Sequence, residues 1–187
     1  MDVLVDVMLL LYSNGSIAVH NLLRIILIAT LPTGDIDDNY PMSAPPQLVS
    51  IGYEGRDIEQ LVAALKTSDV QVLVDVRLTP ISRKRGLSKS ALREALSAVG
   101  IRYVHHRELG NPKDNREAFR QGSSHSRERF RHLLESDQAL DAIHHVTELL
   151  DEGTVALLCF ERDHAQCHRG IVAEVIAEEK HVELTCV

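Results

Sequence analysis

Aromatic residues and cysteines are scarce in this sequence, and tryptophan is absent. Phe and Tyr together make up 4% of the 187 residues, so a platform on which single-stranded nucleic acid stacks its bases is not expected. Three cysteines are too few, and odd in number, for a fold of this length held together by disulfides. We therefore expect free thiols and a reducing, cytoplasmic environment.

No apolar run is long enough to cross a membrane. The apolar stretches 3–11 and 17–31 are interrupted by Asp6, His20 and Arg24, so neither reaches about 18 uninterrupted apolar residues. A secretory signal peptide is not indicated either, because Asp2 places negative charge where such a peptide carries positive charge. We expect a protein without a membrane span.

The chain divides near residue 47. Residues 1–47 form an N-terminal extension that contains a linker-like stretch from Pro32 to Pro41, and Met42 resembles the start of a protein. Three interpretations of residues 1–41 stay open. They are an over-called start, that is, residues ahead of the true translation start, without a functional fold; or they form a helical hairpin packed on the domain; or they form a loose segment at a membrane surface. Residues 48–187 are predicted to form the domain. The net charge of -7 argues against a general binder of polyanions.

From Leu48 onward, short β-branched runs alternate with segments of helical spacing. Strands are predicted at 48–51, 70–76, 101–104, 155–159 and 182–187. Helices are predicted after Asp57 and Ser88, around 130–134, at 140–150 and at 171–176, whereas 111–126 is expected to be a mobile surface loop. This alternation predicts a three-layer α/β fold, with a mostly parallel sheet covered by helices on both faces.

Polar side chains follow the end of each predicted strand. They are Tyr53 and Glu54, Asp75 and Arg77, His105, and finally Cys159, Glu161, Cys167, His168 and Arg169. Because ligands of such folds bind outside the carboxyl ends of the strands, where the loops converge, we expect one functional site there.

Several short motifs carry a family resemblance. They are Ile51-Gly-Tyr-Glu-Gly, Leu73-Val-Asp-Val-Arg, Pro80-Ile-Ser-Arg, Ile101-Arg-Tyr-Val-His, Glu108-Leu-Gly, Leu158-Cys-Phe-Glu and Cys167-His-Arg. From about Leu48 to the last helix, their order and spacing resemble the domain-of-unknown-function 488 (DUF488) family. The resemblance implies a small α/β domain of bacterial or archaeal type, without a settled reaction or ligand. The chain departs from the family at Asn111, where members often have glycine.

The candidate catalytic residues are Cys159, His168, Glu54 and Asp75. Cys159 or His168 is the expected reactive group, and a carboxylate serves as acid, base or orienting partner. The alternatives are that Cys159 is a buried small apolar residue and that His168 only begins a helix. The strand-Cys-loop-helix order also resembles rhodanese-like sulfurtransferases, although Glu161 would oppose an anion there.

A basic run suggests the class of ligand. Six Lys or Arg and no acidic residue lie from Arg77 to Arg93. Guanidinium groups grip oxyanions, so an anionic, phosphate-bearing small molecule or a nucleic acid is expected, with a solvated surface as the alternative. The predicted substrate-binding residues are Tyr53, Arg77, Arg83, Arg85, His105, Glu161 and Arg169.

A zinc site is a further alternative. Cys159, Cys167 and His168, helped by His105 or Asp75, offer the ligands that Zn²⁺ prefers. Against it, the sequence has no Cys-x-x-Cys pair, and adjacent Cys167 and His168 are expected to point apart.

Three functions thus remain open from the sequence: an enzyme with a Cys/His active site acting on an anion, a non-enzymatic nucleic-acid or nucleotide-binding module, and a zinc-binding site. No other cofactor is expected. His144 and His145 are expected on the surface without a partner, and Cys186 is expected in a strand without a catalytic role.

Overall fold

The computed structural model describes residues 45–187, which contain a five-stranded sheet of order β3-β2-β4-β1-β5. The predictions for residues 1–41 lie outside the described residues. The strands are β1 (Gln47–Gly52), β2 (Val72–Asp75), β3 (Arg102–His105), β4 (Val155–Cys159) and β5 (Glu183–Cys186). Each neighbouring pair of strands is parallel. The sheet predicted from the alternating pattern is therefore confirmed.

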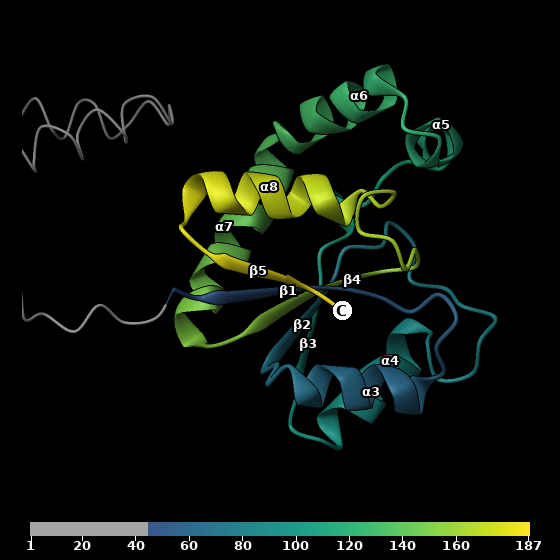
Figure 1. Ribbon diagram of the computed structural model, residues 1–187, viewed down its shortest axis with the longest axis vertical. Coiled ribbons are helices and arrows are strands. Elements are labelled where there is room, and N and C mark those ends of the chain that lie inside the picture. Colours follow the sequence, from purple (N-terminus) through teal and green to yellow (C-terminus); the bar gives the residue numbers. More distant parts are fainter. Residues whose placement is uncertain (1–44) are drawn as a thin grey trace, which may run out of the picture. The chain divides into compact units, whose positions relative to one another are not determined.

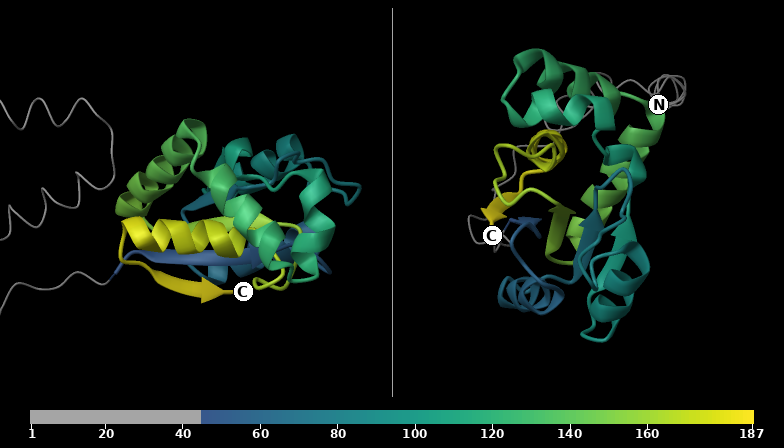
Figure 2. Two further views of the ribbon diagram at one scale, coloured as in Figure 1. Left: turned by 90° about the horizontal axis from the view of Figure 1, so that it is seen from above. Right: turned by 90° about the vertical axis from the view of Figure 1, so that its right-hand side faces the viewer.

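Helices cover both faces of the sheet (Figures 1 and 2). They are α3 (Ile58–Thr67), α4 (Lys89–Ser97), α5 (Arg116–Arg120), α6 (Ser124–Leu134), α7 (Asp137–Glu152) and α8 (Arg169–Glu179), with 3-10 turns η1 (Arg107–Leu109) and η2 (Lys113–Asn115). Helices α3 and α4 lie on one face, and α6, α7 and α8 lie on the other. This arrangement confirms the three-layer α/β prediction.

Successive strand residues supply two separate hydrophobic cores. Val74 and Leu157 pack toward α6, α7 and α8, whereas Leu73 and Leu158 pack toward α3 and α4, and all four are fully buried. Side chains alternate between the faces of a strand, so a sheet covered on both faces has apolar residues at successive positions. This explains why the strands appear in the sequence as unbroken apolar runs.

Local capping fixes where the first helix begins. The Asp57 carboxylate accepts a hydrogen bond from the Gln60 backbone N–H at 2.8 Å, and the Gln60 side-chain oxygen accepts one from the Asp57 N–H at 3.0 Å. This reciprocal pair satisfies two N–H groups that have no partner inside the helix. Further along, Gly100 follows α4 with a φ of 79°, which only glycine adopts without strain. The predicted start of the first helix after Asp57 is confirmed.

The segment 111–126 is not the mobile loop predicted from its polarity. It contains η2, α5 and the start of α6. Its polar residues bond one another in the interior: the Asn115 amide donates to the Asn111 side-chain oxygen at 2.9 Å, and the Ser126 hydroxyl donates to the Asn115 side-chain oxygen at 2.8 Å. Phe119 is buried and packs edge-on against Phe130. The prediction was wrong because polar composition does not reveal polar groups that satisfy each other.

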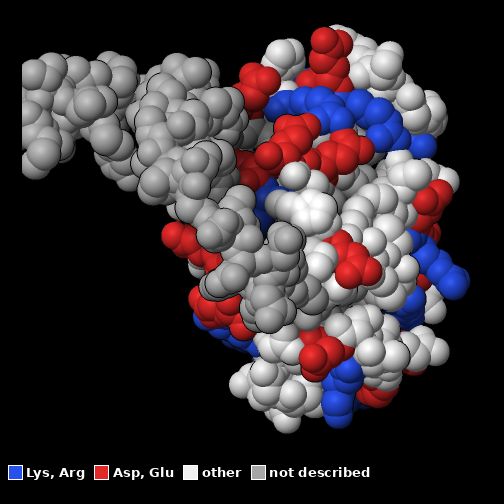
Figure 3. Space-filling view, turned by 60° about the vertical axis from the view of Figure 1, so that its left-hand side comes forward, with Lys and Arg blue, Asp and Glu red and all other residues white. Residues whose placement is uncertain are grey.

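Charges of both signs are mixed on the surface. Figure 3 shows one face on which a band of Lys and Arg lies beside a group of Asp and Glu. Exposed ion pairs such as Arg131–Glu174 and Lys180–Asp151 fit this mixture. No helix among residues 45–187 has the length and apolar character needed to cross a bilayer.

We predict that the domain folds without residues 1–41. Two apolar cores are built from residues of 45–187, and Ala44–Val187 form one compact unit. A variant that begins at Met42 should therefore unfold in one cooperative transition, at a melting temperature close to that of the full chain. Differential scanning calorimetry of both proteins measures this. A broad transition in the shorter protein would mean that the first segment contributes to the core.

Candidate functional site

The carboxyl ends of β1, β2 and β4 meet beneath the loop 160–168. Gly52 at the end of β1 lies opposite Cys159 at the end of β4. The backbone N–H of Glu54 also bonds the Phe160 carbonyl at 2.8 Å, so the pairing continues past the strands. A Cβ at position 52 would collide with the backbone carbonyl of Glu161. Glycine at this position therefore lets the loop cross close above the sheet.

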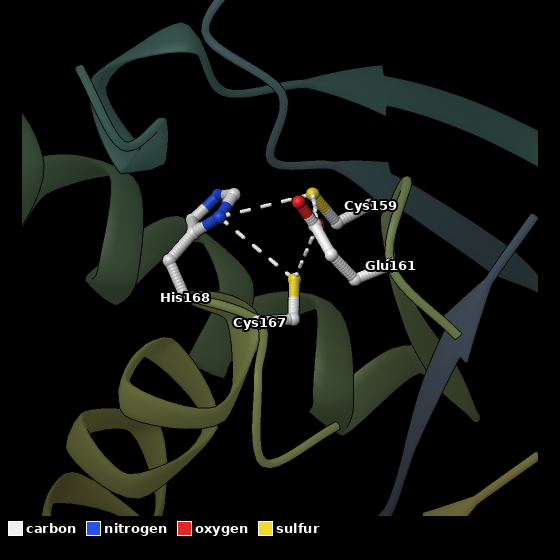
Figure 4. A group of neighbouring side chains, drawn as sticks. All are labelled: Cys159, Glu161, Cys167 and His168. Carbon is white, nitrogen blue, oxygen red and sulfur yellow. Dashed lines mark hydrogen bonds between the residues drawn. The ribbon is translucent and has the colours of Figure 1, made fainter. Parts of the chain in front are cut away.

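Four side chains of this loop and its flanks point toward one another: Cys159, Glu161, Cys167 and His168 (Figure 4). Both thiols lie 3.2 Å from the same oxygen, Oε2 of Glu161. His168 Nδ1 lies 3.7 Å from the Cys159 sulfur and 3.8 Å from the Cys167 sulfur. One potential ligand atom from each residue falls within 4.8 Å of all the others. We call these four residues the Cys/His cluster.

The imidazole of His168 is oriented by the sheet. Its Nε2 lies 3.0 Å from the backbone carbonyl of Val76, and a carbonyl can only accept, so Nε2 carries a proton. The Phe130 ring packs edge-on against the imidazole, with centroids 5.3 Å apart. In the neutral ring Nδ1 therefore presents a lone pair to the two sulfurs. The expectation that adjacent Cys167 and His168 point apart was wrong, because the turn before α8 brings both inward.

Within the Cys/His cluster, the ionised Glu161 carboxylate lies beside the protonated Cys167 thiol. Burial tends to raise the pKa of Glu161, but its own backbone N–H, the two thiols and His168 outweigh burial and hold that pKa below its usual value. Burial raises the pKa of the Cys167 thiol well above its ordinary value, and Cys159 adds to the effect. Burial opposes the charged form of His168, yet contacts with Cys167, the Val76 carbonyl and Glu161 raise its pKa. As it stands, the cluster is a hydrogen-bonded network around Glu161.

A pocket of about 430 Å³ opens beside the cluster. Cys159, Glu161 and His168 line it, whereas Cys167 does not. Apolar side chains, including the half-exposed Phe160 and the 78% exposed Ile81, line it as well. A ligand in this pocket would therefore meet one thiol, one carboxylate and one imidazole together with apolar surface.

Three cations that the sequence analysis did not select also line this pocket: Lys113, Arg116 and Arg120. Arg116 donates from Nε to the Asn111 carbonyl at 3.0 Å, and this bond leaves its two terminal nitrogens for other partners. Arg120 pairs with Glu117, which lines the pocket too. The spacing of these three cations along 113–120 was the signal in the sequence that could have placed them together. It went unused because this segment was expected to be a loop.

The predicted site residues divide into two groups. Tyr53, Arg77, Cys159, Glu161 and His168 line the pocket, and the structure brings them together. The residues that do not line it are Glu54, Asp75, Arg83, Arg85, His105 and Arg169. The suggested zinc helpers, His105 and Asp75, do not join the Cys/His cluster, whereas Glu161 does.

Asp75 and Arg77 are bound to each other. Arg77 donates from Nε to Asp75 Oδ1 at 2.8 Å and from Nη2 to Oδ2 at 2.6 Å. The Tyr103 hydroxyl donates to Asp75 Oδ2 at 2.6 Å, and Arg77 Nη1 also bonds the Tyr53 hydroxyl and the Leu87 carbonyl. Although burial acts against it, the Asp75 carboxylate raises the pKa of Arg77. These contacts use four of the five side-chain N–H donors of Arg77 and both carboxylate oxygens of Asp75.

The other predicted residues outside the pocket differ in exposure. His105 lies between the Lys89 ammonium, 2.9 Å from Nδ1, and the Arg77 carbonyl, 2.9 Å from Nε2. Glu54 is exposed and accepts from the Arg162 backbone N–H. Arg83 and Arg85 are exposed on the loop between β2 and α4. Their assignment to substrate binding stays a prediction.

Arg169 is fully buried and holds the loop to the sheet. Its guanidinium donates to the Ser50 hydroxyl at 2.7 Å and to the carbonyls of Glu161 and Arg162. Those bonds aim its donors at β1 and at the loop rather than at the pocket. Arg169 therefore positions the Cys/His cluster.

A histidine pair lies outside the site. His145 was expected to have no partner, yet its Nδ1 lies 3.0 Å from Nε2 of His106. Burial lowers the pKa of His106, and the neighbouring His145 lowers it further. The expectation failed because the partner comes from a segment 39 residues earlier. His144 is exposed, as expected, and lies 3.5 Å from Glu148.

We predict that Asp75 is needed for stability. Asp75→Asn keeps the shape but leaves the buried Arg77 charge without its partner, which should lower the free energy of unfolding by about 3 kcal/mol or more. Chemical denaturation measures the loss. Glu152→Gln is the matched control, because it breaks an exposed Arg–carboxylate pair with Arg102 and should change stability by less than about 1 kcal/mol. Equal losses in both variants would contradict the buried-pair argument.

Comparison with known proteins gives one match. The family model described as Domain of unknown function DUF488 matches residues 57–176, which include α3, the Cys/His cluster and most of α8. Neither the curated proteins nor the solved structures yielded a match.

Proposed function

Because the chain belongs to the DUF488 family, whose description assigns no function, we propose a function from the site itself: the domain binds an anionic, phosphate-bearing small molecule in the pocket and presents it to the Cys/His cluster. The observation that carries the proposal is that one pocket is lined both by three of the four cluster residues and by Lys113, Arg116 and Arg120. Cations beside reactive groups form an arrangement suited to an oxyanion substrate.

The pocket's cations favour an oxyanion at one part of its wall. Within residues 45–187, Lys113 and Arg116 form no ion pair, so neither charge is neutralised there. Arginine binds phosphate through parallel N–H donors, and Arg116 keeps both terminal nitrogens free of the bond to Asn111. Glu161 opposes an anion and Glu117 is paired with Arg120, so the ligand's charge belongs on the Lys113–Arg116 side.

The remaining lining suits the rest of such a ligand. Phe160 packs edge-on against Tyr53 and is 38% exposed, and Ile81 adds apolar surface. Small-molecule pockets combine apolar walls with a few convergent polar groups, and a volume of about 430 Å³ lies within their usual range. The reactive groups at hand are the Cys159 thiol and the His168 imidazole, and a reaction would act through them.

The alternative is a non-enzymatic nucleic-acid or nucleotide-binding module. The exposed Arg83 and Arg85 support it, since a solvent-facing basic loop can neutralise backbone phosphates. Salt separates the two functions. Binding of an oligonucleotide through many phosphates weakens steeply as salt rises, whereas binding of one small anion depends on salt only weakly.

We predict that Arg116→Gln weakens phosphate binding. Losing one charge-assisted hydrogen bond costs about 1.5 kcal/mol, which corresponds to about a tenfold loss of affinity. Isothermal titration calorimetry of the full chain, with inorganic phosphate and with a nucleoside monophosphate, measures it. Lys113→Gln should act in the same direction. The Lys113 ammonium makes no hydrogen bond to another residue of the described part, so this substitution disturbs the fold less than Arg116→Gln does.

Arg83→Gln is the control for charge. It removes the same unit of charge from an exposed position that does not line the pocket. If the anion binds in the pocket, the affinity of Arg83→Gln for both anions equals that of the unaltered protein, whereas the sequence-based assignment of Arg83 to substrate binding predicts a loss. If Arg83→Gln weakens binding as much as Arg116→Gln, the anion binds on the loop 77–87 instead. If neither anion binds at all, the proposed ligand class is wrong.

A further inference from the structure

We propose that Cys159, Glu161, Cys167 and His168 form a tetrahedral binding site for one Zn²⁺ ion. The four potential ligand atoms are two sulfurs, one carboxylate oxygen and one imidazole nitrogen, and all lie within 4.8 Å of one another. A bound metal would occupy the Cys159 thiol and the His168 imidazole, which are free to react only in the metal-free domain, whereas anion binding at Lys113 and Arg116 does not involve the four ligands. The two can therefore be tested separately.

The spacing of the ligand atoms matches a tetrahedron around zinc. With Zn–S of about 2.3 Å and Zn–N or Zn–O of about 2.0–2.2 Å, a sulfur and a lighter ligand atom lie about 3.5–3.7 Å apart. The sulfur–nitrogen separations here are 3.7 and 3.8 Å, and the sulfur–oxygen separations are 3.2 Å. Small side-chain movements bring all four atoms to bonding distance of a common centre.

The imidazole already has the orientation of a metal ligand. His168 donates from Nε2 to the Val76 carbonyl and turns Nδ1 toward the sulfurs. Metal-binding histidines almost always donate their second N–H to such an acceptor, which fixes the tautomer and makes the other nitrogen a better ligand. The Phe130 ring packed against the imidazole limits its rotation further.

Charge does not oppose a metal at this position. Zn²⁺ would replace two thiol protons, which go to solvent, so the cluster with its Glu161 carboxylate carries a net charge of -1 both without the metal and with it. The buried Arg169 guanidinium lies against the same loop, and within residues 45–187 its partners are all neutral oxygens. A buried cation without an anionic partner is costly. The negative charge of the nearby cluster offsets part of that cost, and metal binding preserves it.

One backbone feature favours a thiolate at Cys167. Cys167 lies just ahead of α8, an 11-residue helix whose N-terminal end carries partial positive charge. Thiolates are stabilised near such ends. Sulfur ligands select zinc and other soft metals over Mg²⁺ and Ca²⁺, and a four-coordinate set of sulfur, nitrogen and oxygen suits zinc.

Titration of the reduced, metal-free full chain with Co²⁺ tests the proposal, since Co²⁺ takes tetrahedral zinc sites and reports on its ligands. One equivalent should produce visible d–d bands together with near-ultraviolet thiolate-to-cobalt charge transfer, and Zn²⁺ should abolish both. Cys159→Ser and Cys167→Ser should each weaken metal binding by more than about 100-fold, because losing a metal ligand costs more affinity than losing a residue that only hydrogen-bonds to a ligand. Cys186→Ser, which changes an exposed thiol on β5, should bind as the unaltered protein does.

Glu161→Gln keeps both thiols and tests the fourth ligand even if a serine variant fails to fold. It should retain the charge-transfer band but bind Zn²⁺ at least about tenfold more weakly in competition with a chromophoric chelator. The four-ligand site is overturned if Co²⁺ binds without charge transfer, if Cys186→Ser loses the band, or if Glu161→Gln binds zinc unchanged. Absence of any binding overturns the metal altogether. Phosphate titration of the same metal-free protein reports on the pocket independently.

Discussion

The buried guanidinium of Arg169 holds the site together. It links the Ser50 hydroxyl on β1 to two successive carbonyls of the loop that follows β4. Those carbonyls belong to Glu161 and Arg162, so the position of the Glu161 side chain depends on this contact. Gly52 makes the contact sterically possible, because any larger residue would push the loop off the sheet. The geometry of the Cys/His cluster thus depends on the Arg169 guanidinium and on the absence of a side chain at Gly52.

A second buried arginine has a different part in the same region. Arg77 and Asp75 form a pair, completed by Tyr53 and Tyr103, that joins β2 to β3 and to the residue after β1. Arg77 has an anionic partner and Arg169 has none among residues 45–187. The charge of Arg77 is therefore balanced by Asp75, and this pair stabilises the sheet. The charge of Arg169 has no such partner within these residues and lies near two thiols and a carboxylate. Arg77, which follows β2, and Arg169, which begins α8, therefore differ in whether an anion balances their charge.

Sequence reasoning recovered the layers and the sheet because apolar periodicity and capping act locally. The helix that begins after Asp57 and the unbroken apolar strand β4 are examples, and both appear where they were expected. It also placed Cys159, Glu161 and His168 near each other, since parallel strands end at a common edge. It could not separate Arg169 from Arg77, because burial and hydrogen-bond partners come from tertiary packing. For the same reason the Asn115–Ser126 network was mistaken for a mobile loop.

The two walls of the pocket come from parts of the chain with unlike constraints. Cys159 and His168 come from the end of β4 and the start of α8, where sheet pairing and Arg169 restrict movement. Lys113 and Arg116 come from η2 and α5, short elements held by a small polar network. Rigid strand ends suit groups whose mutual geometry must be fixed, such as metal ligands. Charged residues on this short helical segment can be replaced without disturbing the core. Substitutions there can therefore alter which ligand the proposed site binds.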